Sequence, residues 1–233
     1  MRLFTLAVIA LALAACSGAD KEAQQRAQAQ AATEAAAAKD ASAYQQLVAA
    51  QSWELAQSIG REVVRKYPDS AAAAEVRKTL PDVDARANAL LDAKRMAELW
   101  TYQSGSQSGG EQHSASMYSK EPSGEQQVRL ILRRHAEWGQ SVYLHGGKQG
   151  FTCRTPCTVL ARFDDAPAVK LEASIPEGGE PAVFIEDDKD FLARMDAAQR
   201  VAFEVERKGA GPQTVVFEVG GYDASKWAQL SKK

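Results

Sequence analysis

From Gln127 onward, apolar and polar residues alternate with a period of two, and this pattern constrains the fold more than any other feature. Successive side chains of a strand point to opposite faces, so this alternation is typical of strands with one buried face. The alternating segments are short, and they begin at Val128, Val142, Thr158, Val169, Val183, Val201 and Val215. About eight short strands with turns between them predict an antiparallel β-sandwich or barrel.

One segment inside the strand region departs from the alternation. Residues 187–199, DDKDFLARMDAAQ, are charged and amphipathic and predict a single inserted helix. Asp187 or Asp188 is its expected N-cap, with Phe191, Leu192 and Met195 facing inward. The strands and this helix together define a predicted β-sandwich domain over residues 100–233.

Residues 44–99 follow a helical period instead. Trp53, Ala56, Val63 and Tyr67 recur at three- to four-residue spacing, which predicts one apolar helix face. Proline disfavours a helical conformation in the residue before it, so Pro68 and a second proline at position 81 predict helix breaks. We therefore expect separate helices over residues 70–80 and 82–98. With the strands that follow, this segment makes the predicted fold class α+β.

The run Lys66-Tyr67-Pro68-Asp69-Ser70, followed by small residues, resembles the turn between tetratricopeptide-type repeats of envelope lipoproteins. In such repeats the small residues let the next helix approach closely. A stable array generally needs three or more repeats, and the similar stretch is too short for that. Either a repeat fragment docked on the next domain or a plain helical hairpin is consistent with this pattern.

The N-terminus has the layout of a signal peptide. Arg2 precedes a short apolar run that ends in Leu13-Ala14-Ala15-Cys16, and the run is too short to span a bilayer stably. We expect residues 1–15 to be removed. Residues 16–43 are rich in Ala and Gln but poor in large apolar side chains, which predicts a partly helical, mobile tether.

The tetrad Leu13-Ala14-Ala15-Cys16 resembles the lipobox of bacterial lipoproteins. The resemblance implies a diacylglycerol thioether on Cys16 and acylation, for example by palmitate, of its new amino group. Several acyl chains anchor a protein far more firmly than one. Ser17 in the next position implies, by similarity to enterobacterial sorting, the outer membrane with the protein facing the periplasm.

The two other cysteines, Cys153 and Cys157, are expected to pair, because an exported chain meets an oxidising compartment. Redox-active dithiols usually have two intervening residues and lie at a helix N-terminus, whereas three residues separate this pair between predicted strands. A structural disulfide that pins a β-hairpin is the favoured interpretation. A thiol redox protein that uses Cys153 and Cys157 is the alternative.

Other candidate sites are weak. The three histidines are not at metal-binding spacing, no Gly-x-Ser-x-Gly motif occurs, and we predict no catalytic residue, metal or cofactor. Arg133, Arg134 and His135 could form a basic patch for an anionic glycan or a lipid head group, or simply the solvent-facing end of a strand. The formal net charge of −2 argues against a nucleic-acid partner.

The order Phe151-x-Cys153, Cys157-x-Val159 and Arg162-Phe163-Asp164, with the later strands, resembles small exported β domains. These are the invasion-associated locus B type and the TagO type of type VI secretion accessory proteins, and neither implies an active site. We therefore predict a non-enzymatic envelope lipoprotein that binds or scaffolds other envelope proteins. The Phe-x-Cys entry also resembles lysozyme-inhibitor lipoproteins, which gives a second candidate function.

Overall fold

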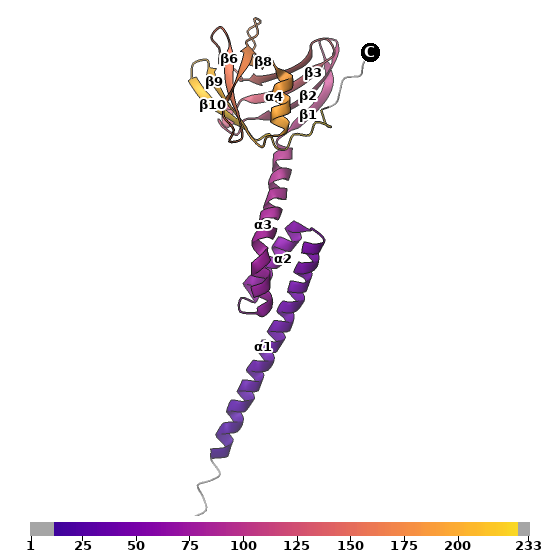
Figure 1. Ribbon diagram of the computed structural model, residues 1–233, viewed down its shortest axis with the longest axis vertical. Coiled ribbons are helices and arrows are strands. Elements are labelled where there is room, and N and C mark those ends of the chain that lie inside the picture. The colour runs from indigo at the N-terminus through magenta and orange to yellow at the C-terminus, as the bar shows by residue number, and fades with distance from the viewer. Residues whose placement is uncertain (1–11, 228–233) are drawn as a thin grey trace, which may run out of the picture. The chain divides into compact units, whose positions relative to one another are not determined.

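A computed structural model describes residues 12–227, with helices in the N-terminal part and strands after them (Figure 1). The predicted α+β class is therefore confirmed. The chain divides into two compact units, Met1–Leu90 and Leu91–Lys233. Residues 1–11 of the predicted signal peptide lie outside the described part, and so do the side chains of residues 12–18, including Cys16. Within residues 12–227, no helix has the length and apolar character needed to cross a bilayer.

The helical unit contains α1 (Ala12–Ala49), α2 (Trp53–Lys66) and the first part of α3 (Ala71–Glu98). The three helices share a small core in which the Tyr44 hydroxyl of α1 lies 2.8 Å from Thr79 Oγ1 of α3. Gly60 makes this packing possible, because a Cβ at that position would lie 2.8 Å from both Leu80 Cδ1 and Tyr44 Cε2. Close approach of three helices thus depends on one residue without a side chain.

The helices run longer than the sequence predicted. The predicted tether, residues 16–43, belongs to the continuous helix α1, and its last part packs against α2 through the buried Ala37 and Ala41. The predicted break at Pro81 is wrong, because α3 continues through it. A proline inside a helix costs about 3 kcal/mol. Here the buried stripe of Val76, Val83 and Ala87 continues across the proline, and its packing offsets that cost.

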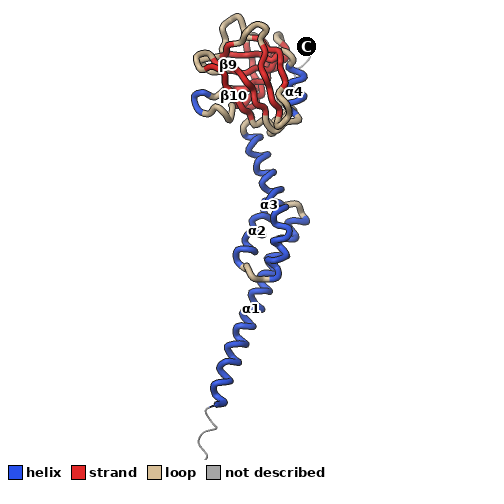
Figure 2. Tube along the Cα trace, turned by 60° about the vertical axis from the view of Figure 1, so that its left-hand side comes forward, coloured by secondary structure: helices blue, strands red, loops and turns tan. Residues whose placement is uncertain are grey.

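The second unit is built on one antiparallel sheet of ten strands. Its order is β1-β2-β3-β4-β8-β7-β6-β9-β10, and β5 also pairs with β9. The strands are β1 (Thr101–Gln107), β2 (Gly110–Tyr118), β3 (Arg129–His135), β4 (Gly139–His145), β5 (Phe151–Thr152), β6 (Thr158–Phe163), β7 (Val169–Ser174), β8 (Ala182–Ile185), β9 (Val201–Arg207) and β10 (Gly211–Phe217). The predicted sandwich of about eight strands approximates this curved sheet, which wraps around a single core (Figure 2).

The inner face of the sheet carries the core. Its largest fully buried apolar side chains are Trp227, Phe191, Phe203, Phe217, Met117, Leu130, Leu132, Leu144 and Met195. Helix α4 (Asp188–Asp196) contributes Phe191, whose ring centroid lies 5.7 Å from that of Phe163 and 5.6 Å from that of Phe203. The Asp187 carboxylate accepts a hydrogen bond from the Asp190 N–H at 3.0 Å. The predicted helix, its cap and its inward face are confirmed.

Candidate functional site

The predicted basic patch is not a single surface. Arg133 lies on the outer face of the sheet, whereas the guanidinium of Arg134 lies 3.5 Å above the ring of Trp227 and donates to the Trp227 carbonyl. His135 is completely buried and its ring stacks on Trp138, with centroids 3.8 Å apart. His135 Nδ1 accepts from the backbone N–H of Trp138, so Nε2 carries the proton that it donates to the Gln107 carbonyl. Only Arg133 of the three is therefore available on the outer face.

A different set of residues comes together around Arg133. Leu130 and Leu132 point into the core, so Arg129, Ile131 and Arg133 point outward along β3. The pairing of strands places aromatic side chains beside them on the outer face. These are Tyr118 opposite Arg129, Tyr143 opposite Ile131, Phe184 opposite Tyr143, and Trp138 in the β3–β4 turn. We call this set the arginine–aromatic face.

Both arginines of this face are held over aromatic rings. The guanidinium carbon of Arg133 lies 5.2 Å from the Trp138 ring centroid and 5.3 Å from that of Tyr143. The Arg129 guanidinium carbon lies 5.7 Å from the Tyr118 centroid. Cation–π contact of this kind is attractive, and most so where water is partly excluded. Burial raises the pKa of Tyr143, so its hydroxyl stays protonated and neutral beside Arg133.

Each arginine also donates to a serine on the neighbouring strand. Arg129 Nη2 donates to Ser116 Oγ at 2.7 Å, and Arg133 Nε donates to Ser141 Oγ at 3.2 Å. Neither guanidinium forms an ion pair with any carboxylate of the described chain. The predicted patch of three consecutive residues leaves out Arg129, because residues two apart, not consecutive ones, share one face of a strand. The spacing Arg129-x-x-x-Arg133 in an alternating segment was the signal.

Cys153 and Cys157 lie in the segment between β5 and β6. Their sulfur atoms are 2.10 Å apart, the distance of a disulfide. Thr152 of β5 pairs with Glu206 and Leu160 of β6 pairs with Glu204, so β5 and β6 run in the same direction along β9. The expected hairpin is therefore wrong: the disulfide closes a short detour between two collinear strand segments. Neither cysteine is at a helix N-terminus, which favours a structural over a redox role.

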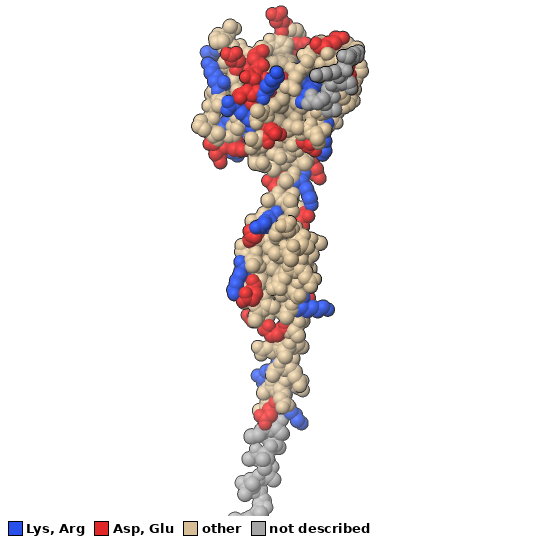
Figure 3. Space-filling model, turned by 45° about the vertical axis from the view of Figure 1, so that its right-hand side comes forward, with Lys and Arg blue, Asp and Glu red and all other residues tan. Residues whose placement is uncertain are grey.

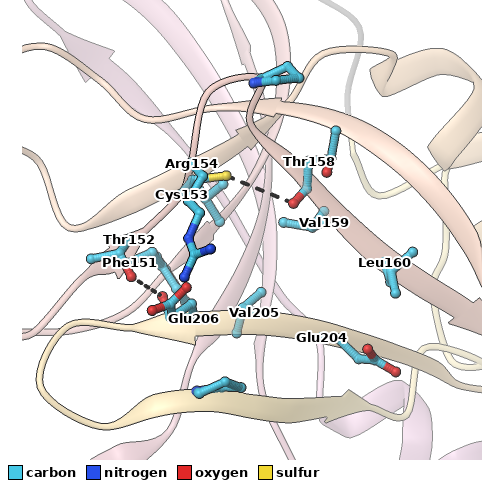
Figure 4. Close-up of a pocket in the computed structure, with 13 residues that line it drawn as sticks. Phe151, Thr152, Cys153, Arg154, Thr158, Val159, Leu160, Glu204, Val205 and Glu206 are labelled. Atoms are coloured by element: carbon cyan, nitrogen blue, oxygen red, sulfur yellow. Dashed lines mark hydrogen bonds between the residues drawn. The ribbon is translucent and has the colours of Figure 1, made fainter.

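A cavity of about 350 Å³ opens beside this detour. Figure 4 shows Arg154 pointing toward Glu206 at its rim, with Thr152, Thr158 and Leu160 nearby. Among residues 12–227, no group of three or more His, Cys, Asp or Glu side chains could hold a metal ion. On the face of the β unit drawn in Figure 3, acidic and basic side chains are intermixed rather than segregated.

Strand β1 forms one edge of the sheet. Ser108 and Gly109, with φ of 48° and 83°, make a two-residue turn to β2, so the pair Gln107–Gly110 is hydrogen-bonded. Bonded pairs alternate along an antiparallel ladder, and the backbone groups of Tyr102, Ser104 and Ser106 therefore point away from β2. No described backbone group bonds them there. A hollow of about 480 Å³ lies along β1, lined by β1 with Gln112 and Ser114 of β2.

The opposite edge, β10, is partly covered. The segment before β3 bridges to it, because Lys120 N–H donates to the Val216 carbonyl and Val216 N–H donates to the Glu121 carbonyl, each at 2.8 Å. Beside this bridge, Glu218 accepts from Arg95 of α3 and from Lys120. The hydrogen bond from Arg95 has the largest effect on the pKa of Glu218 and lowers it. Burial alone would raise this pKa, and the hydrogen bond from Lys120 lowers it further.

The Glu218→Gln variant is expected to be less sensitive to acid than the wild type. A carboxylate whose folded-state pKa is lowered contributes stability above its unfolded pKa, near 4.5, and this is lost as pH falls through the folded pKa. The variant should lose about 1 kcal/mol or less at pH 7, and its difference from the wild type should shrink as pH falls below 4.5. Urea unfolding between pH 3 and pH 7 measures this, with exposed Glu177→Gln as the control. A wild-type advantage that persists at the lowest pH would contradict the assignment.

No protein-family model and no curated protein matches the chain. Among solved structures, invasion associated protein B from Bartonella henselae is similar at 17% sequence identity with a TM-score of 0.35. The match covers 52% of this chain and 84% of that chain.

Proposed function

We propose that this protein is a lipid-anchored module of the bacterial cell envelope that binds another envelope protein and catalyses no reaction. The observation that carries the proposal is the open backbone edge of β1. Three residues there, Tyr102, Ser104 and Ser106, point N–H and C=O groups away from β2, and no described residue bonds them. An extended segment of a partner protein could add to this edge as a further strand.

The composition of β1 supports strand addition. Native edge strands are commonly protected by charged residues, proline or bulges, and β1 (TYQSGSQ) has none of these. Gly105 has open space where a Cβ would stand, and the hollow along β1 leaves room for side chains of an incoming strand. The edge at β10, by contrast, is bridged by Lys120 and Glu121. A partner strand therefore has one favourable edge to join.

The second part of the proposal is a lipid anchor on Cys16. The lipobox-like tetrad ending at Cys16 supports acylation of that residue and attachment to the outer membrane, facing the periplasm. The partner would then be a protein within reach of the membrane surface. Incorporation of labelled palmitate, lost in a Cys16→Ala variant, tests the anchor separately from the binding edge.

The binding edge is tested by photo-cross-linking in intact cells that express the full chain. A photoreactive residue replaces the exposed Gln103 of β1, and Ser106→Pro removes one outward N–H. An edge position whose N–H faces solvent tolerates proline, so the fold should be kept. Loss of one backbone hydrogen bond, with its acceptor left buried, should reduce the adduct roughly tenfold or more.

Ser106→Ala is the matched control, because it shortens the same side chain and keeps the N–H. It should leave the adduct unchanged. An adduct of equal yield in Ser106→Pro and Ser106→Ala would refute strand addition. An adduct with the mass of two copies of this chain would mean that the β1 edge binds a second copy of the chain and not a different protein.

A further inference from the structure

We propose that the arginine–aromatic face binds an acidic polysaccharide, whose carboxylate groups Arg129 and Arg133 would hold. This site is separate from the β1 edge and does not depend on it. It uses the outer face of β2, β3, β4 and β8, whereas strand addition uses backbone groups of β1. The two can therefore fail independently.

The guanidinium groups are oriented before any ligand arrives. Each guanidinium lies over an aromatic ring and donates one hydrogen bond to a serine. Arg129 donates to Ser116, and Arg133 donates to Ser141. Arginine presents its N–H groups in a rigid planar fork that matches a carboxylate. Because no described carboxylate pairs with either group, the remaining N–H donors are open to an external anion.

The charged side chains that point outward within the strands of this face are the two arginines. On the outer face of β2, β3 and β4, alternation places no Asp or Glu, and the acidic residues next to these strands are Glu137 in the β3–β4 turn and Glu186 after β8. Arg129 and Arg133 stand four residues apart on one strand, about 13 Å at 3.3 Å per residue. Two cations held at this separation on one face suit a chain that carries repeated negative charges.

The remaining side chains favour a sugar over a peptide. Tyr118 and Trp138 are 58% and 47% exposed, so parts of their rings are available to stack on sugar rings beside the two arginines. The same face carries uncharged hydrogen-bonding side chains suited to hydroxyl groups, Gln112 and Ser114 of β2. An acidic polysaccharide offers a partner to each of these groups. It has carboxylates for the arginines, ring faces for the aromatic residues, and hydroxyls for the amides and serines.

Titration calorimetry of the full chain in detergent, with oligogalacturonate as the probe, tests the site. The oligomer carries a carboxylate on each ring, and its methyl-esterified form is the neutral control. Arg129→Gln and Arg133→Gln should each weaken binding roughly tenfold, since each removes hydrogen bonds to a charged group. Arg162→Gln, at an exposed arginine of β6, should change nothing. Arg133→Lys keeps the charge without the fork and should give an intermediate loss.

Polyglutamate separates a glycan from an acidic peptide. Tyr118→Ala should weaken oligogalacturonate binding more than any polyglutamate binding, because only the sugar loses a ring to stack on. Polyglutamate that binds as tightly as oligogalacturonate would overturn the glycan assignment. Equal binding of the carboxylated and esterified oligomers, or equal effects of Arg162→Gln and Arg133→Gln, would overturn the site.

Discussion

Trp227→Ala is expected to lower the free energy of unfolding of the β unit by about 3–5 kcal/mol, the usual cost of truncating a buried aromatic residue. Trp227 is 2% exposed, and its indole N–H donates to the His113 carbonyl at 3.3 Å. The Arg134 guanidinium stacks on its ring and bonds its carbonyl. The truncation would remove a large apolar surface and the indole hydrogen bond to the His113 carbonyl.

Urea unfolding followed by far-ultraviolet circular dichroism measures this effect, because the signal does not depend on the tryptophan removed. Trp227→Phe should recover part of the loss, since it keeps most of the apolar volume but not the N–H. Lys226→Ala, at the exposed neighbouring position, should stay within about 0.5 kcal/mol of the wild type. A Trp227→Ala midpoint equal to that of Lys226→Ala would mean that the C-terminal segment does not belong to the core.

The role of Trp227 could not be predicted from the sequence. Periodicity reports which residues are apolar on one face of an element, and Trp227 belongs to no strand or long helix. Its partners, Arg134 and His113, lie far away along the chain. Only the curvature of the sheet brings the end of the chain to them, and curvature depends on many pairings at once rather than on any local pattern.

The strands from β3 onward were predictable because one face of each is buried. Leu130, Leu132, Val142 and Leu144 recur with a period of two along β3 and β4, and all are fully buried. Strands β1 and β2 escaped prediction because Ser, Gly and Gln give no hydrophobic period. The signal there was the Ser108-Gly109 turn, whose positive φ angles suit a two-residue hairpin. A turn signal alone rarely outweighs missing alternation.

The candidate sites were predictable to different extents. The disulfide was predicted from the cysteine count and the predicted export, but its place between two collinear strand segments required the pairing of β9 with both β5 and β6. Of the predicted basic patch, Arg133 lies on the outer face of β3, whereas Arg134 packs on Trp227 and His135 is buried under Trp138. Neighbours in sequence diverge on a strand, so the functional grouping depends on cross-strand register that the sequence does not state.

Arg207 is a buried arginine at the end of β9. It is 3% exposed, and burial lowers its pKa. Nη1 donates to the Gln126 carbonyl at 2.6 Å and Nη2 to the Gly146 carbonyl at 2.7 Å, while Nε has no partner among the described residues. One buried cation thus ties the end of β9 to two connections, the turn before β3 and the loop after β4.

Two opposing effects determine how much the free energy of unfolding changes when Arg207 is replaced. Burial of an unpaired charge is unfavourable, so an apolar residue of similar length would relieve desolvation. The same change leaves two carbonyls without donors, at about 1–3 kcal/mol each if they stay buried. Arg207→Ala adds a cavity to that loss, so we expect about 3–5 kcal/mol for Arg207→Ala and about 1–3 kcal/mol for Arg207→Met.

Guanidinium unfolding followed by tryptophan fluorescence would rank the variants, with exposed Arg162→Met as a control expected within about 0.5 kcal/mol of the wild type. The order wild type, then Arg207→Met, then Arg207→Ala follows if the carbonyl bonds outweigh the desolvation of the charge. A methionine variant as stable as the wild type would show that desolvation cancels those bonds. In that case Arg207 would fix the position of the two connections without adding net stability, because the bonds would still exist only in the native arrangement.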